Sequence, residues 1–162
     1  WCPAPFGLRR QLTSSLGPRK HNLWQPNTHM SAVEYLRDAP LDPAEVIRVF
    51  NASGIQRPTS DAPRIKRMFS APSLIISAWL EGRLVGVCRS LTDFAYCCYL
   101  SDLAVDQSVQ GQGIGTELIR RTRAAIGDEV SLILLSAAGA MSYYPQVGFE
   151  RAENAFVIKR QR

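Results

Sequence analysis

The hydrophobic and polar positions of residues 31–162 follow two different periods, and the change from one to the other separates expected strands from expected helices. Alternating or continuous apolar stretches that fit strands occur at 33–37, 74–80, 83–89, 96–105, 131–135 and 155–159. Only Glu81 and Gly82 separate the second stretch from the third, a spacing typical of a tight antiparallel hairpin. These stretches predict a central sheet of six to seven strands.

Helical spacing of apolar residues fills several of the segments between these strands. Asp42 and Pro43 suit the N-cap and the first position of a helix that ends near Gly54. Further helices are expected at 61–69, from the glycine-rich segment to Ile126, and at 138–144. The helix that ends at Ile126 has one apolar face, made of Ile114, Leu118, Ile119, Thr122 and Ala125.

The order of these elements predicts a mixed α/β domain of the α+β type. An antiparallel meander comes first, and a strand–loop–helix–strand crossover between 96 and 135 then makes two neighbouring strands parallel. We expect a mostly antiparallel central sheet with helices on both faces, in a single domain over 31–162. Residues 1–30 follow neither period and are rich in Pro, Gln, Asn and Ser, so we expect a disordered or vector-derived tail there.

The charge distribution narrows the classes of partner. The net charge is +5, but Arg9, Arg10, Arg19 and Lys20 supply +4 of it, and residues 31–162 hold 15 basic and 14 acidic side chains. A nucleic-acid-binding face needs its basic residues inside the folded domain, so no nucleic-acid partner is expected. The sequence has no apolar run of 18 residues, so no membrane span is expected either.

The cysteines indicate the compartment and argue against a metal. Cys2, Cys88, Cys97 and Cys98 lack the spacing of metal ligands, and only two histidines are present to complete such a site. No metal is therefore expected. The sequence also lacks the pattern of a secretory leader, so we expect reduced cysteines in a cytoplasmic protein.

Three glycines on alternate positions, Gly111, Gly113 and Gly115, stand directly before an amphipathic helix. Their backbone amides can turn toward one point, where the helix N-terminus adds unpaired N–H groups and the positive end of its dipole. This arrangement predicts an anion site, most often for a phosphate. The spacing does not fit a dinucleotide-binding motif, and a P-loop would need Lys where Thr116 stands.

Two motifs together resemble the GNAT N-acetyltransferase superfamily. The first is Gln110-x-x-Gly113-x-Gly115 after a strand that ends Leu103-Ala104-Val105. The second is Ala140-Met141-Ser142-Tyr143-Tyr144-Pro145-Gln146-Val147-Gly148-Phe149, and the two occur in the order of that superfamily and at about its spacing. The resemblance implies a GNAT-like acyl-CoA N-acyltransferase fold with acetyl-CoA as the co-substrate.

The resemblance also implies which residues bind acetyl-CoA. The loop backbone would hold the pyrophosphate, and the preceding strand would pair with the pantetheine arm like an added strand. That strand is expected to splay from the strand at 131–135, which leaves a gap for the thioester. The residues concerned are Leu103, Ala104 and Val105 of the strand, and Gln110, Gly111, Gln112, Gly113, Ile114, Gly115 and Thr116 of the loop.

Tyr144 matches the tyrosine that faces the thiol sulfur in the superfamily and protonates the leaving thiolate. The identity of the general base is left open, because Tyr99 and Ser101 occupy positions where several members of the superfamily carry a Glu or a His. Asp102 has two interpretations, a base that faces the substrate after a strand bulge or a structural carboxylate. The sequence leaves both open.

The expected function is an acetyl-CoA-dependent N-acetyltransferase that transfers the acetyl group directly to a primary amine of a small molecule. Two alternatives stay open, a non-catalytic acyl-CoA-binding or regulatory domain and an enzyme that acetylates a protein amine. Arg57, Arg64, Lys66 and Arg67 flank the expected acceptor pocket and suit either a solvated helix face or an acidic acceptor. Many members of the superfamily form dimers, so a homodimer is also open.

Overall fold

The computed structural model describes residues 32–71 and 73–161, so the tail expected at 1–30 lies outside the described residues. The described part folds around a five-stranded sheet with the order β1-β2-β3-β4-β5. The first four strands are antiparallel, and β5 runs parallel to β4. The strands are β1 Glu34–Arg37, β2 Leu74–Leu80, β3 Arg83–Thr92, β4 Cys97–Val105 and β5 Ser131–Leu134. The helices are α1 Pro43–Ser53, α2 Ala62–Ser70 and α3 Ile114–Ile126.

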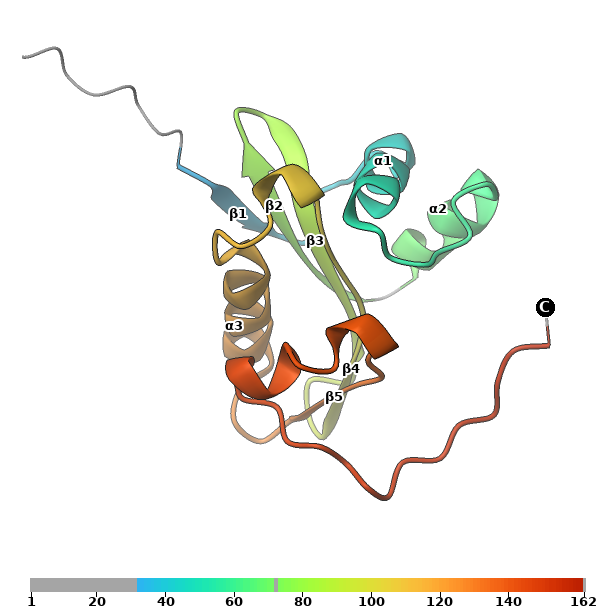
Figure 1. Cartoon of the computed structure of the whole chain (residues 1–162), viewed down its shortest axis with the longest axis vertical. Coiled ribbons are helices and arrows are strands. Elements are labelled where there is room, and N and C mark those ends of the chain that lie inside the picture. Colours follow the sequence, from blue (N-terminus) through green and yellow to red (C-terminus); the bar gives the residue numbers. More distant parts are fainter. Residues whose placement is uncertain (1–31, 72, 162) are drawn as a thin grey trace, which may run out of the picture. The chain divides into compact units, whose positions relative to one another are not determined.

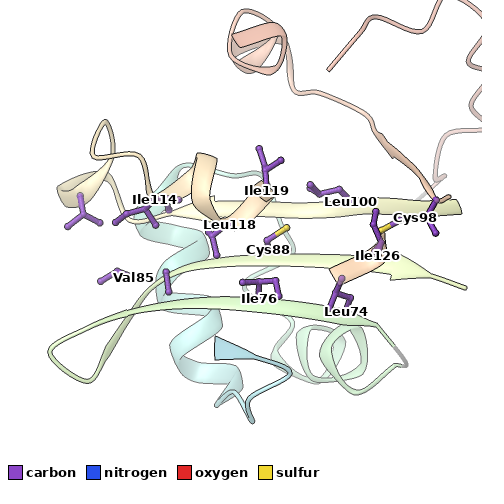
Figure 2. Packing of buried hydrophobic residues seen from close by; sticks show 14 residues of the cluster. Leu74, Ile76, Val85, Cys88, Cys98, Leu100, Ile114, Leu118, Ile119 and Ile126 are labelled. Carbon is purple, nitrogen blue, oxygen red and sulfur yellow. The ribbon is translucent and has the colours of Figure 1, made fainter. Parts of the chain in front are cut away.

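Helices cover both faces of the sheet, with α3 on one side and α1 and α2 on the other (Figure 1). On the α3 face, Leu118 and Ile119 pack among Ile76, Cys88 and Leu100 of the strands (Figure 2). A second cluster joins α1 and α2 to the opposite face through Val46, Val49, Phe50, Ile65, Leu84, Val87 and Ala104. This arrangement confirms the mixed fold with helices on both faces. Among the described residues no helix is both long and apolar enough to cross a membrane.

Local chemistry places the helix ends where the sequence predicts them. The Asp42 carboxylate accepts a hydrogen bond from the backbone N–H of Ala44 at 2.9 Å, which caps α1. Gly54 ends α1 in the left-handed conformation, with φ of 80° and ψ of 4°. Gly127 follows α3 with the same positive φ but a ψ of 177°, and its N–H donates to the Arg123 carbonyl. The tight turn between β2 and β3 also forms as expected, since Glu81 and Gly82 have φ of 51° and 75°.

Three local expectations were wrong. The strand β3 continues to Thr92 instead of ending at Arg89, because Leu91 and Thr92 still pair with β4. The short α-helix expected at 138–144 is replaced by two 3-10 turns, η2 Ala138–Ala140 and η3 Tyr144–Val147. The backbone N–H groups of Ala140, Met141 and Tyr143 donate to carbonyls three residues earlier, which is the spacing of a 3-10 turn. Gly139 also lowers the helix propensity of this short segment.

The final strand expected at 155–159 does not form, so the described sheet has five strands instead of six to seven. Phe156, Val157 and Ile158 are consecutive apolar residues, and all three are exposed. Such a run lacks the alternation that lets a strand bury one face and solvate the other, and it forms a strand only where both faces are covered.

Candidate functional site

The glycine-rich segment forms an open cradle at the start of α3. Gly111 and Gly113 adopt φ of 76° and 82°, a backbone conformation that residues with a Cβ rarely adopt. Gly113 is the N-cap of α3, and no side chain hydrogen-bonds the amides of the first turn. The N–H groups of Ile114, Gly115 and Thr116 have no carbonyl one turn earlier in the helix. The uncapped helix start therefore suits an anion.

Gly115 is tightly enclosed. A Cβ at this position would lie 2.9 Å from the Tyr143 hydroxyl oxygen, so even alanine would force Tyr143 to move. The same hydroxyl lies 3.4 Å from Thr116 Oγ1. Tyr143 thus lies over the first turn of α3, where its hydroxyl adds a polar group beside the backbone amides.

The strand β4 has an open edge next to this cradle. Its pairing with β5 ends at Leu100 and Leu134, so residues 101–105 have no strand beside them on that side within the described part of the chain. The Val105 carbonyl accepts a hydrogen bond from the Gln110 side chain at 2.8 Å. The pairing of β4 with β5 thus ends where the splay is expected, and it leaves a backbone edge to which an extended group can pair.

The cradle and the open edge line one cleft of about 520 Å³. Eight of the ten residues expected to bind acetyl-CoA line it, namely Leu103, Val105, Gln110, Gly111, Gly113, Ile114, Gly115 and Thr116. Ala104 and Gln112 do not line it, and the Ala104 side chain is buried in the cluster on the α1 and α2 face. Sequence reasoning missed Val109, Ala140 and Tyr143 in the lining. Ala140 and Tyr143 had a local signal, since both lie within the second motif.

Tyr144 lines the same cleft from η3. Its ring packs edge-on against Tyr143 and Phe149, with ring centroids 5.4 and 5.6 Å away. Burial raises the pKa of the Tyr144 phenol above its ordinary value of 10.0, and the nearby Arg57 charge opposes this effect. The phenol therefore keeps its proton at neutral pH and can donate it.

Asp102 lies on the opposite face of β4, outside the cleft. It is fully buried, and each carboxylate oxygen accepts a hydrogen bond from a guanidinium. Arg57 Nε binds Oδ1, and Arg89 Nε binds Oδ2 at 2.6 Å. Because both oxygens are occupied by arginines, this geometry favours the structural interpretation of Asp102 over the general base.

A bulge explains how Arg89 reaches two partners. Arg89 pairs with Asp102 and Ser90 pairs with Leu100, so Ser101 is an extra residue in β4. As a result the Ser101 hydroxyl and the Asp102 carboxylate both face Arg89, whose Nη2 lies 3.0 Å from Ser101 Oγ. The guanidinium also lies over the Phe69 ring, 5.6 Å from its centroid. The sequence placed Arg57 beside the acceptor pocket but did not predict its pairing with Asp102. Arg89 escaped sequence reasoning, although a charged residue late in the buried strand β3 is a weak signal.

Two of the cysteines are poor nucleophiles. Cys88 is fully buried, and this burial raises the pKa of its thiol to about 11. Burial also raises the pKa of Cys98. Because the thiolate is the reactive form, neither side chain suits a covalent acyl intermediate at neutral pH.

Comparisons with known proteins agree with this geometry. A model of the acetyltransferase (GNAT) domain matches residues 71–151. The chain is 33% identical over 72 residues to the chloroplastic GCN5-related N-acetyltransferase 2 of Arabidopsis thaliana, and 34% identical over 72 residues to histone acetyltransferase TAP1 of Glycine max. Each match covers 43% of this chain, and it spans only 28% and 31% of those proteins.

Solved structures share the fold. An aminoglycoside acetyltransferase from an uncultured soil metagenomic sample superposes with a TM-score of 0.62 at 22% identity, covering 80% of this chain and 96% of that one. A GNAT family acetyltransferase from Brucella melitensis, solved in complex with acetyl-CoA, gives a TM-score of 0.59 at 21% identity over 75% of this chain and 84% of that one.

Proposed function

Since the chain belongs to the GNAT acetyltransferase family, we propose that it transfers an acetyl group from acetyl-CoA directly to a primary amine of a small molecule. One observation carries this proposal. The uncapped start of α3, the open edge of β4 and the half-buried Tyr144 line one cleft. The three features supply an anion site, a backbone edge and a proton donor.

The cleft fits acetyl-CoA on the side of the phosphates. The backbone amides of Ile114, Gly115 and Thr116 would hold the diphosphate. Because Tyr143 leaves no room for a side chain at Gly115, the diphosphate would meet main-chain groups there. Leu103 and Val105 would hold the pantetheine arm through their backbone. When bound, acetyl-CoA supplies the activated acetyl thioester.

Tyr144 is the proposed proton donor. Its raised pKa keeps the phenol protonated, so it can give a proton to the sulfur as the thiolate leaves. We also propose that Asp102 acts as an anchor for Arg57 and Arg89 and is not the base. The amine would then lose its proton to water or to a group on the substrate.

The amine would approach from the face that carries α1 and α2. The cleft lies on the α3 face, and the amine would reach it beyond Leu100, where the pairing of β4 with β5 ends. Direct transfer at this point needs no acyl-enzyme intermediate, which agrees with the raised thiol pKa of Cys88 and Cys98.

The test is release of free CoA thiol from acetyl-CoA in the presence of a broad panel of amines, with mass spectrometry of the products. We expect N-acetylated small amines. Tight binding of acetyl-CoA without thiol release for any amine would instead support a non-catalytic acyl-CoA-binding domain. Turnover with lysine peptides alone would favour a protein acceptor, the class of acceptor in the name of the Glycine max histone acetyltransferase.

A further inference from the structure

The pair of arginines on Asp102 leaves an excess of positive charge on the amine side of β4. Two guanidinium groups share one carboxylate, so the cluster Arg57–Asp102–Arg89 carries a net charge of +1. Asp102 is fully buried, whereas a quarter of the Arg57 side chain is exposed. The one acid of the cluster is therefore unavailable to an incoming ammonium group, while Arg57 is accessible.

Arg57 also has hydrogen-bonding capacity left over. Its Nε donates to the Asp102 carboxylate. Its Nη1 donates to the Gln56 carbonyl and its Nη2 to the Ser101 carbonyl, both at 2.7 Å. Arginine has five N–H donors, so two have no acceptor among the described residues. The two remaining donors, one on Nη1 and one on Nη2, are of the kind that binds a carboxylate or phosphate oxygen.

The helix α2 adds further positive charge to this side. It carries Arg64, Lys66 and Arg67, and none of them forms an ion pair within residues 32–71 and 73–161. The end of α2 lies against the cluster, because Arg89 donates to the Met68 carbonyl and lies over the Phe69 ring.

Beyond the cluster, the same face of the sheet is apolar and uncovered. Leu91, Tyr99 and Ile133 are cross-strand neighbours on β3, β4 and β5, and their exposed fractions are 41%, 37% and 49%. Leu91 lies two residues after Arg89 and therefore on the same face. These three residues lie beside the end of the β4–β5 pairing, where the amine would reach the cleft.

We propose that the acceptor is a small amine with an apolar body and an anionic group, carboxylate or phosphate, that binds Arg57 while the apolar body lies on Leu91, Tyr99 and Ile133. This inference rests on the proposed acetyl transfer. The positive charge at Arg57 and on α2 disfavours acceptors that bring further ammonium groups, such as polyamines, aminoglycosides and lysine-rich peptides. It also disfavours protonation of the bound amine, which helps to supply the neutral nucleophile without a carboxylate base.

The test compares three linear amines that differ only at the far end: 5-aminopentanoate with a carboxylate, 1-pentylamine with a methyl group and 1,5-diaminopentane with a second ammonium. Thiol release from acetyl-CoA gives kcat/KM for each. We expect the carboxylate amine to exceed pentylamine by about tenfold to a hundredfold, the range of a charge-assisted hydrogen bond, and the diamine to be poorest. O-phosphoethanolamine against ethanolamine then shows whether phosphate is preferred to carboxylate.

Arg57→Gln should reduce the ratio of carboxylate amine to pentylamine toward one. If that variant does not fold, the exposed pair Lys66→Gln and Arg67→Gln should reduce the same ratio by a smaller factor. Lys159→Gln with Arg160→Gln removes the same charge from an exposed segment that belongs neither to α2 nor to the cleft, and it should leave the ratio unchanged.

The outcomes separate the two levels of the proposal. Equal rates for the three amines, a preference for the diamine, or a ratio unaffected by both variants would overturn the anionic acceptor while leaving acetyl transfer in place. Binding of acetyl-CoA without thiol release for any amine would instead overturn the proposed function, and this inference with it.

Discussion

The two sides of β4 are built by different means. On the α3 side, the cleft is built mainly from main-chain amides, glycines and a strand edge, with tyrosines over it. On the α1 and α2 side, three charged side chains from separate elements interlock, with Asp102 fully buried between two arginines. The first side suits one invariant ligand, whereas the second is built from side chains whose exchange would alter selectivity.

This difference also decides how a substitution acts on each side. A backbone cradle changes only when the backbone is forced to move, so most exposed side chains around it are replaceable. A buried ion cluster fails when any one member is removed, because an unpaired charge then stays inside the protein. Four predictions follow from the contrast, and they run from the largest expected effect to the smallest.

Gly113→Val should remove acetyl-CoA binding. The position has φ of 82°, so valine forces the loop out of its cradle and turns the first amides of α3 away from the diphosphate. Isothermal titration with acetyl-CoA measures the effect. Gly127→Val is the matched control, since Gly127 has φ of 80° at the other end of α3 and outside the cleft. Similar acetyl-CoA binding by the two variants would contradict the role of the cradle in binding the diphosphate.

Tyr144→Phe should lower kcat by about a hundredfold to ten-thousandfold, the usual contribution of a positioned proton donor. The acetyl-CoA dissociation constant should change little, because the ring still packs against Tyr143 and Phe149. Stopped assays of thiol release with a separate binding measurement distinguish the two effects. Tyr143→Phe is the control and should affect binding more than kcat; equal losses in kcat and affinity for Tyr144→Phe would indicate a packing role.

Asp102→Asn should destabilise the protein by about 3–5 kcal/mol, the range for removing one partner of a buried ion pair. Urea unfolding followed by circular dichroism measures it. The protein that remains folded should still bind acetyl-CoA, because the cleft lies on the other face of β4. Asp128→Asn, whose side chain is fully exposed, is the control acid. A stable variant without turnover would restore Asp102 as the general base.

Glu117→Gln should change only the acid dependence of stability. Hydrogen bonds from Arg120, and then from Arg121, lower the pKa of the Glu117 carboxyl from 4.5 to about 2. Because the folded-state pKa is the lower one, the stabilisation is present above about pH 4.5 and is lost as the pH falls toward 2. Unfolding curves of the two proteins should therefore differ at pH 6 and converge near pH 2. A constant difference over this range would contradict the assignment.

The sequence made the α3 side predictable because its signals are local. Alternate glycines before an amphipathic helix are adjacent in the chain, and their conformations follow from the absence of a Cβ. The hairpin at Glu81 and Gly82 and the cap at Asp42 are local in the same sense.

The cluster on the other side could not be predicted in this way. Arg57 and Asp102 lie 45 residues apart in sequence, and Arg89 and Asp102 lie 13 apart. Their meeting depends on strand register and on the extra residue Ser101, which no short pattern specifies. The final strand at 155–159 failed for a related reason, since strand propensity alone does not provide a neighbour to pair with.

The extra residue in β4 also acts as a spacer within the strand. Every residue from Asp102 onward is advanced by one position relative to β3, and the start of the glycine loop is advanced with it. Deleting Ser101 would make the two strands equal in count and would leave Arg89 one polar partner on β4 instead of two. The number of residues in β4 thus fixes how the arginine cluster on one face lies relative to the glycine-rich cradle on the other. Insertions or deletions in β4 should therefore be tolerated far less than substitutions.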